Sequence, residues 1–217
     1  MRRGPIPSSL FPRLLAAATG SAAAQAAAEP PARIFDSVAL YAGQGVDLNL
    51  RELPGAVLRG DLHRESSYFV SLGLGKVWGT LGGSVEALRG SFVENVRHGY
   101  EVVLVQHHGL QDNFELGAAY LLRSPDLALG HLRANAAGGA GLSHAFGTPS
   151  YEDGPAGDPG RRYPTQLLIL LEAEWSWDSL PQVALVTRVH HRSGAYGTIA
   201  PSGVGSNFVA AGLRYRF

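Results

Sequence analysis

Alternation of side-chain character is the feature that most constrains this chain. Between positions 66 and 78 four apolar residues share one parity, Tyr68, Val70, Leu72 and Leu74, and four small or polar residues share the other, Ser67, Ser71, Gly73 and Gly75. Successive side chains of a β-strand point to opposite faces, so this pattern predicts a strand with one apolar and one polar face.

Similar segments recur along the chain, and we count eight of them. They span residues 34–45, 66–78, 100–108, 113–123, 127–146, 165–177, 182–191 and 207–217. Turn residues separate several of them, as at Ser124, Pro125 and Asp126. The chain also contains 28 Gly and 13 Pro, which is many for a helical protein. We therefore expect a single all-β domain.

The N-terminus has the order of features that a secretion signal requires. Arg2, Arg3 and Arg13 precede the apolar residues 14–18, and the small residues 20–28 offer several A-x-A cleavage sites. We expect residues 1–28 to be a cleaved signal peptide and residues 29–217 to be the mature domain. The alternative, an N-terminal arm of a cytoplasmic protein, does not explain this order.

The remaining chain has no apolar run of about 18 residues, the length of a membrane-spanning helix. Strands can cross a membrane only as a closed barrel, because every backbone N–H and C=O group must be paired inside lipid. We therefore predict an all-β, closed antiparallel transmembrane β-barrel of about eight strands with periplasmic termini. Longer loops at 46–65, 147–164 and 193–206 would face outward, and the location would be the outer membrane of a Gram-negative bacterium.

Charged residues fall on the polar parity and would share the barrel interior. They are Glu115, Glu172, Glu174, Arg123, Arg133, Arg188, Arg214 and Arg216. The interior of an eight-stranded barrel is just wide enough to be filled by side chains, so these charges predict a paired plug rather than a pore. Glu172 and Glu174 could also suggest acid–base chemistry, but ion pairs that hold the wall are the favoured interpretation.

Two further segments bear on assembly. The chain ends in Arg214-Tyr215-Arg216-Phe217, which resembles the C-terminal recognition signal of outer-membrane barrels and implies the barrel-assembly machinery as a partner. An ordinary edge strand that ends on Phe217 is the alternative. Segment 79–99 is too long for the short turn expected there, and we predict a short helix or an extra strand pair.

One constellation has the residue types of a hydrolase. Alternation places Val189, His191 and Ser193 on the apolar, lipid-facing side of the seventh strand, near the outer rim. A histidine and a serine two residues apart on a strand can exchange a hydrogen bond, as a general base and a nucleophile must. The alternative is a polar rim, and His107 and His108 end the third strand in the same way.

This His-x-Ser pair within an eight-stranded layout resembles the outer-membrane lipid A deacylases. The resemblance covers the barrel layout and about the last thirty residues, and it implies His191 as base and Ser193 as nucleophile. In that family an acidic residue on the final strand orients the histidine. Here residues 194–217 contain no Asp or Glu, and the matching region holds Gly205, Ser206 and Asn207.

A second departure from the family is Gly194, where members tend to have asparagine. The sequence therefore leaves two functions open. The first is a structural or interaction barrel, and the second is a serine esterase that removes acyl chains from lipid A or phospholipid using His191 and Ser193. A small diffusion pore is disfavoured by the charged interior. In each case outer-membrane lipid, with lipid A as the candidate, is the expected partner.

Other ligand classes are not expected. Eighteen basic residues balance eighteen acidic ones, so the basic surface of a nucleic-acid-binding protein is missing. The chain has no cysteine, which excludes thiolate metal sites and disulfides. A metal site built from the pairs His107-His108 and His190-His191 would be weak without nearby carboxylates. We predict no metal and no cofactor.

Overall fold

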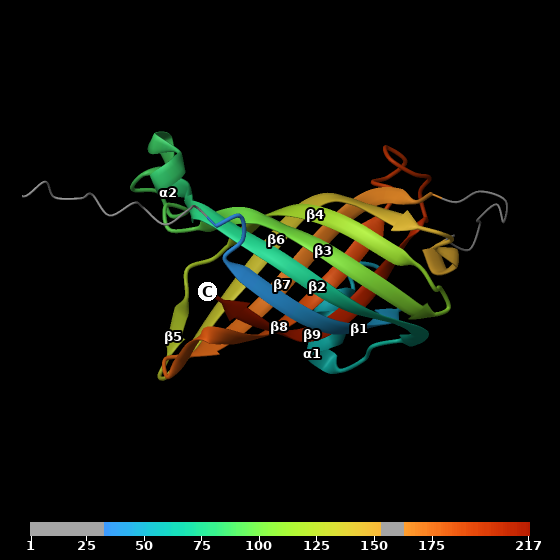
Figure 1. The fold of residues 1–217 in the computed structure, drawn as a ribbon, viewed down its shortest axis with the longest axis horizontal. Helices are drawn as coiled ribbons and strands as arrows, with labels where there is room; N and C mark the ends of the chain where they lie inside the picture. The colour runs from blue at the N-terminus through green and yellow to red at the C-terminus, as the bar shows by residue number, and fades with distance from the viewer. Residues whose placement is uncertain (1–32, 153–162) are drawn as a thin grey trace, which may run out of the picture. The chain divides into compact units, whose positions relative to one another are not determined.

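The computed structural model describes residues 33–152 and 163–217, so the predicted signal peptide lies outside the described residues. Nine strands form one antiparallel sheet that closes on itself, because β1 pairs with β9 and β4 pairs with β6 (Figure 1). The eight long strands are β1 (Ser37–Val46), β2 (Arg64–Thr80), β3 (Arg97–Gly109), β4 (Phe114–Arg123), β6 (Leu132–Phe146), β7 (Thr165–Trp177), β8 (Leu180–Ser193) and β9 (Gly205–Arg216). The predicted class, a closed antiparallel barrel of eight strands, is confirmed.

The predicted fifth strand needs a correction. Residues 127–146 form a hairpin rather than one strand, in which the short β5 (Leu127–Leu129) pairs only with the start of β6. Gly130, between the two, has a φ of 66°, a left-handed value that glycine accepts and that turns the chain. Strand β5 therefore lies outside the closed ring.

Segment 79–99, for which the sequence predicts a short helix or an extra strand pair, is helical. It contains α2 (Leu81–Ser84) and the 3-10 helix η1 (Glu86–Leu88) before β3 begins. The side chain of Thr80 caps α2 by accepting a hydrogen bond from the N–H of Gly83 at 3.2 Å. Within the described ranges no helix is both long and apolar enough to cross a membrane.

Side chains alternate between the lumen and the outside, as the sequence predicts. On β2, Ser67 and Phe69 are buried, whereas the intervening Tyr68 and the next residue Val70 are exposed. The other long strands follow the same rule, and their exposed apolar side chains include Leu40, Leu116, Leu142, Leu185 and Leu213. An outer wall of this kind is suited to hydrocarbon.

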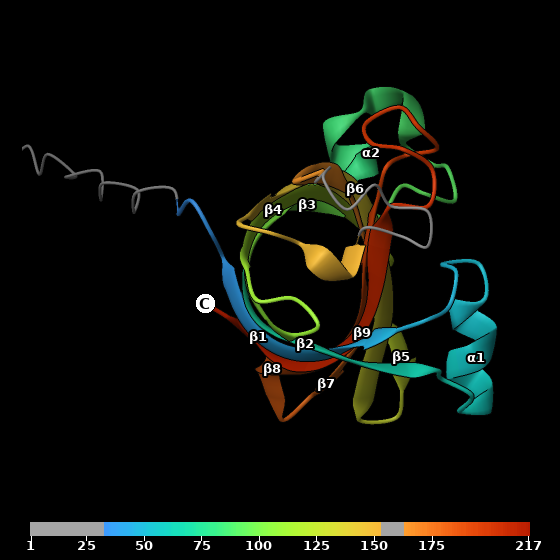
Figure 2. The same cartoon turned by 90° about the vertical axis from the view of Figure 1, so that its right-hand side faces the viewer.

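The two ends of the barrel differ in their connections. At one end, called the terminal end, β1 begins and β9 ends, because Ser37 pairs with Arg216, and a tight turn at Asp178 joins β7 to β8. The opposite end, called the loop end, holds three long connections, 47–63, 147–164 and 194–204, whereas the terminal end holds one, 81–96. Helix α1 (Leu53–Arg59) lies beside the barrel, and the 3-10 helix η2 (Ser150–Glu152) lies across its mouth (Figure 2).

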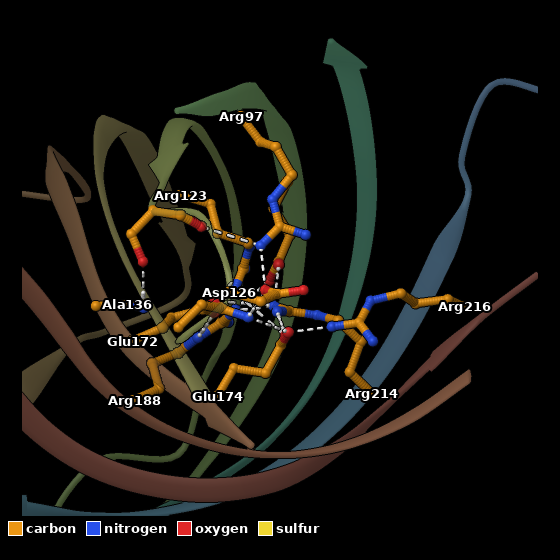
Figure 3. A network of polar contacts seen from close by, with 12 residues as sticks. Arg97, Arg123, Asp126, Ala136, Glu172, Glu174, Arg188, Arg214 and Arg216 are labelled. Carbon is orange, nitrogen blue, oxygen red and sulfur yellow. Dashed lines mark hydrogen bonds and ion pairs between the residues drawn. The ribbon is translucent and has the colours of Figure 1, made fainter. Parts of the chain in front are cut away.

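Toward the terminal end, an ion-pair network crosses the lumen. Glu172 accepts hydrogen bonds from Arg123 at 2.6 Å and from Arg214 at 2.9 Å, and it also pairs with Arg188 (Figure 3). Glu174 pairs with Arg123, Arg214 and Arg216, and Glu101 pairs with Arg188 and Arg214. The predicted plug of paired charges is therefore present.

Arg133 is an exception, and its predicted place in the lumen is wrong. Its side chain is exposed and donates to Asp178 at 2.7 Å. Strand β6 extends beyond its neighbour here, because β4 ends at Arg123, opposite Ala137. Arg133 therefore has the inward parity but no facing wall of the lumen.

Candidate functional site

Strand β8 places His191 and Ser193 on the outer face of the barrel. The residues between and before them, Arg192 and His190, point inward and are 0% and 1% exposed, whereas His191 and Ser193 are partly exposed. Ser193 is the last residue of β8, so the pair lies at the loop end of the wall.

Asn207 lies directly opposite His191. The two residues are paired across β8 and β9, and His191 Nδ1 is 2.7 Å from Asn207 Oδ1. The Nδ2 group of Asn207 donates to the carbonyl oxygen of Leu48 at 2.8 Å. A carbonyl oxygen only accepts hydrogen bonds, so the contact with Leu48 fixes which end of the amide faces the imidazole.

The contact between His191 Nδ1 and Asn207 Oδ1 determines the tautomer of His191. An amide oxygen accepts, so Nδ1 must carry the hydrogen, and Nε2 of a neutral ring is then an acceptor. An acceptor at Nε2 is what a general base toward a serine hydroxyl needs. Asn207 thus lies where it can hold the His191 ring in this orientation.

In the sequence, Asn207 stands out only as part of a region without acidic residues. Its pairing with His191 depends on the register of β8 against β9, and the connection 194–204 between them is too long to fix that register. The alternation within each strand shows from the sequence that both side chains point outward, but it does not identify Asn207 as the residue opposite His191.

Ser193 is two residues from His191 on the same face, and it pairs with Gly205 on β9. Both His191 and Ser193 belong to the described part of the chain, and no hydrogen bond joins them. Catalytic hydrogen bonds are often long in enzymes without substrate and shorten when it binds.

Position 194, directly after Ser193, requires glycine for a steric reason. A Cβ on Gly194 would lie 2.1 Å from the carbonyl oxygen of Ala200 and 2.5 Å from that of Pro201. The Gly194 carbonyl also accepts from the N–H groups of Gly197 and Ala200, at 3.2 and 3.1 Å. The turn after β8 is packed directly on this residue, so a side chain at position 194 does not fit here.

A second Ser–His pair lies at the terminal end. Ser84 Oγ is 2.6 Å from His98 Nε2, and His98 Nδ1 is 3.0 Å from the hydroxyl of Tyr120. The His98 ring packs with Trp78 and Tyr120 in an aromatic cluster on the outer face, which is typical of the membrane–water interface. Ser84 provides an internal comparison for any test of Ser193.

The histidine pairs do not converge on a metal site. His107 and His190 point into the lumen, where their Nε2 atoms lie 2.9 and 3.0 Å from the two oxygens of Glu115. His108 and His191 point outward instead. Among the residues that the structure describes, no group of three or more His, Cys, Asp or Glu side chains could hold a metal ion.

No protein-family model matches this chain, and no curated protein matches it in sequence. Among solved structures it is similar to the outer membrane enzyme PagL, with a TM-score of 0.54 and 14% identity, over 83% of this chain and 99% of that one. The fold is that of an outer-membrane β-barrel. A weaker similarity is to Neisserial surface protein A (NspA), with a TM-score of 0.46 and 11% identity, over 83% of this chain and 96% of that one. Another is to LpxR from Salmonella typhimurium, with a TM-score of 0.30 and 11% identity, over 77% of this chain and 61% of that one.

Proposed function

We propose that this chain is an outer-membrane serine esterase that removes acyl chains from lipid A or phospholipid. The observation that supports this most directly is the 2.7 Å contact between His191 Nδ1 and Asn207 Oδ1 on the lipid-facing wall. With residues 1–28 as a signal peptide and the termini in the periplasm, the loop end faces the cell exterior. Ser193 then lies at the depth of the acyl esters of outer-leaflet lipids.

The proposed reaction follows the serine-hydrolase pattern. Ser193 Oγ attacks the ester carbonyl carbon while His191 Nε2 takes the hydroxyl proton. The tetrahedral intermediate then expels the lipid alkoxide, which receives that proton, and leaves an acyl-serine. Water, deprotonated by His191, attacks the acyl-serine and releases the fatty acid and the free enzyme.

Asn207 would act by orientation rather than by charge. In a Ser-His-Asp site, an amide in place of the acid loses rate because the imidazole adopts the wrong tautomer. Here the Leu48 carbonyl turns the amide oxygen toward the ring and so favours the productive tautomer. Cys-His-Asn sites use an amide in the same role.

Lipid analysis tests the proposal. Cells that express the full chain should yield lipid A or phospholipid lacking an acyl chain by mass spectrometry, and Ser193→Ala should restore the unmodified lipid. Ser84→Ala is the matched control, because it removes the other histidine-adjacent hydroxyl, and it should keep the activity. An unmodified lipid profile in cells whose outer membrane contains the folded wild-type barrel would contradict the esterase and leave the structural or interaction barrel.

A further inference from the structure

The inner side of the wall behind His191 and Ser193 contacts a buried carboxylate in the barrel mouth. Glu152, the last residue of η2, is 1% exposed and lies in the barrel mouth. It accepts hydrogen bonds from Gln166 Nε2 at 2.9 Å, Arg192 Nη1 at 2.5 Å and Ser206 Oγ at 2.9 Å. One residue of the 147–164 connection therefore joins β7, β8 and β9 from the inside.

The strand register places this contact at the candidate site. Arg192 and Ser206 are directly paired across β8 and β9. The next pair in one direction is His191 with Asn207, and the next in the other direction is Ser193 with Gly205. The Arg192–Ser206 pair held by Glu152 thus lies between the His191–Asn207 pair and the Ser193–Gly205 pair of the candidate site.

The charge of Glu152 matters because Arg192 is fully buried. Arg192 also donates from Nε to Ser143 Oγ at 2.8 Å and from Nη2 to the Pro164 carbonyl at 2.7 Å. Its Nε lies 3.7 Å from Glu115, which is already bonded to two histidines. Without the Glu152 carboxylate, the buried guanidinium of Arg192 loses its closest counter-charge, and we expect its side chain to change position.

We propose that Glu152 is a positioning residue for the site on the opposite side of the wall. By holding Arg192 and Ser206 together, it fixes the pairing of β8 with β9 at the point where His191 must meet Asn207. The catalytic consequence rests on the proposed function. The structural consequence, an effect of Glu152 on the His191 ring, does not.

Nuclear magnetic resonance of ring nitrogens tests the inference. The full barrel, labelled with 15N-histidine and held in detergent micelles, gives an Nδ1–H signal for His191 that His191→Ala assigns. Glu152→Gln should shift or broaden this signal and lower kcat for lipid A hydrolysis by about a hundredfold, as small misplacements of catalytic groups do, with KM little changed.

Glu174→Gln is the matched control. Glu174 is also buried and binds three arginines, but its network lies toward the terminal end. This variant should lower barrel stability and leave the His191 signal and kcat unchanged. If Glu152→Gln does not fold, Ser206→Ala, which removes one hydrogen bond to Glu152, should shift the same signal by a smaller amount.

The two proposals fail in different ways. An unmoved His191 signal in folded Glu152→Gln, or an equal shift in Glu174→Gln, would overturn the positioning role. In the fallback test, an unmoved signal in folded Ser206→Ala would do the same. A wild-type barrel that hydrolyses no lipid would overturn the esterase, and the signal of His191 would still decide the role of Glu152.

Discussion

Replacing Glu172 with alanine should lower the free energy of unfolding by about 3–5 kcal/mol, the usual effect of removing one partner from a buried ion pair. Glu172 is 5% exposed and accepts from Arg123 at 2.6 Å, from Arg188 Nε at 2.9 Å and from Arg214 at 2.9 Å. Its loss leaves these three guanidinium groups to share two carboxylates, Glu101 and Glu174, in the lumen.

The measurement is the fraction of folded barrel against urea concentration, followed by the different mobility of folded and unfolded barrels in gel electrophoresis. Glu86→Ala is the control, because the Glu86 side chain is exposed and lies 3.9 Å from Arg89. Exposed pairs of this kind contribute little to stability, so this variant should unfold like the wild type. Equal stability of Glu172→Ala and wild type would show that the lumenal network does not hold the barrel.

Replacing Asn207 with alanine should reduce kcat for acyl-chain release by about a hundredfold to ten-thousandfold, the range over which histidine orientation acts in serine hydrolases. Alanine removes the acceptor for His191 Nδ1–H and lets the ring change tautomer. It does not touch the lumen, because the Asn207 side chain lies on the outer face with His191.

Asn207→Asp is the informative partner of this variant. A carboxylate still accepts from His191 Nδ1, but it cannot donate to the Leu48 carbonyl, so the two oxygens must move apart. We expect its kcat to stay within about tenfold of the wild-type value, since the acceptor for the ring is kept. Full activity of Asn207→Ala on purified lipid A would exclude the orienting role.

The fold was largely accessible from the sequence because a closed barrel imposes one rule on every strand. Strand β7 has the predicted bounds, Thr165–Trp177, and Glu115 and Glu172 have the predicted inward direction. The hairpin at Gly130 was missed because the short β5 and the start of β6 read as one continuous segment.

The candidate site could be predicted from the sequence only in part. The parity of β8 identified the outward direction of His191 and Ser193, but cross-strand partners follow from register, which a long connection does not specify. Asn207 was therefore not recognised as the partner of His191. Glu152 was missed for a different reason, because it lies in a connection without any periodic pattern and is buried only by tertiary contacts.

In the proposed esterase, Ser193 is an activated nucleophile on the outer wall of the barrel. Such a serine is tested by reaction of the purified, folded barrel with a fluorophosphonate, followed by mass spectrometry of its peptides. We expect an adduct on Ser193 that is lost in His191→Ala and reduced in Asn207→Ala. An unlabelled Ser193, or labelling of Ser84 instead, would contradict it.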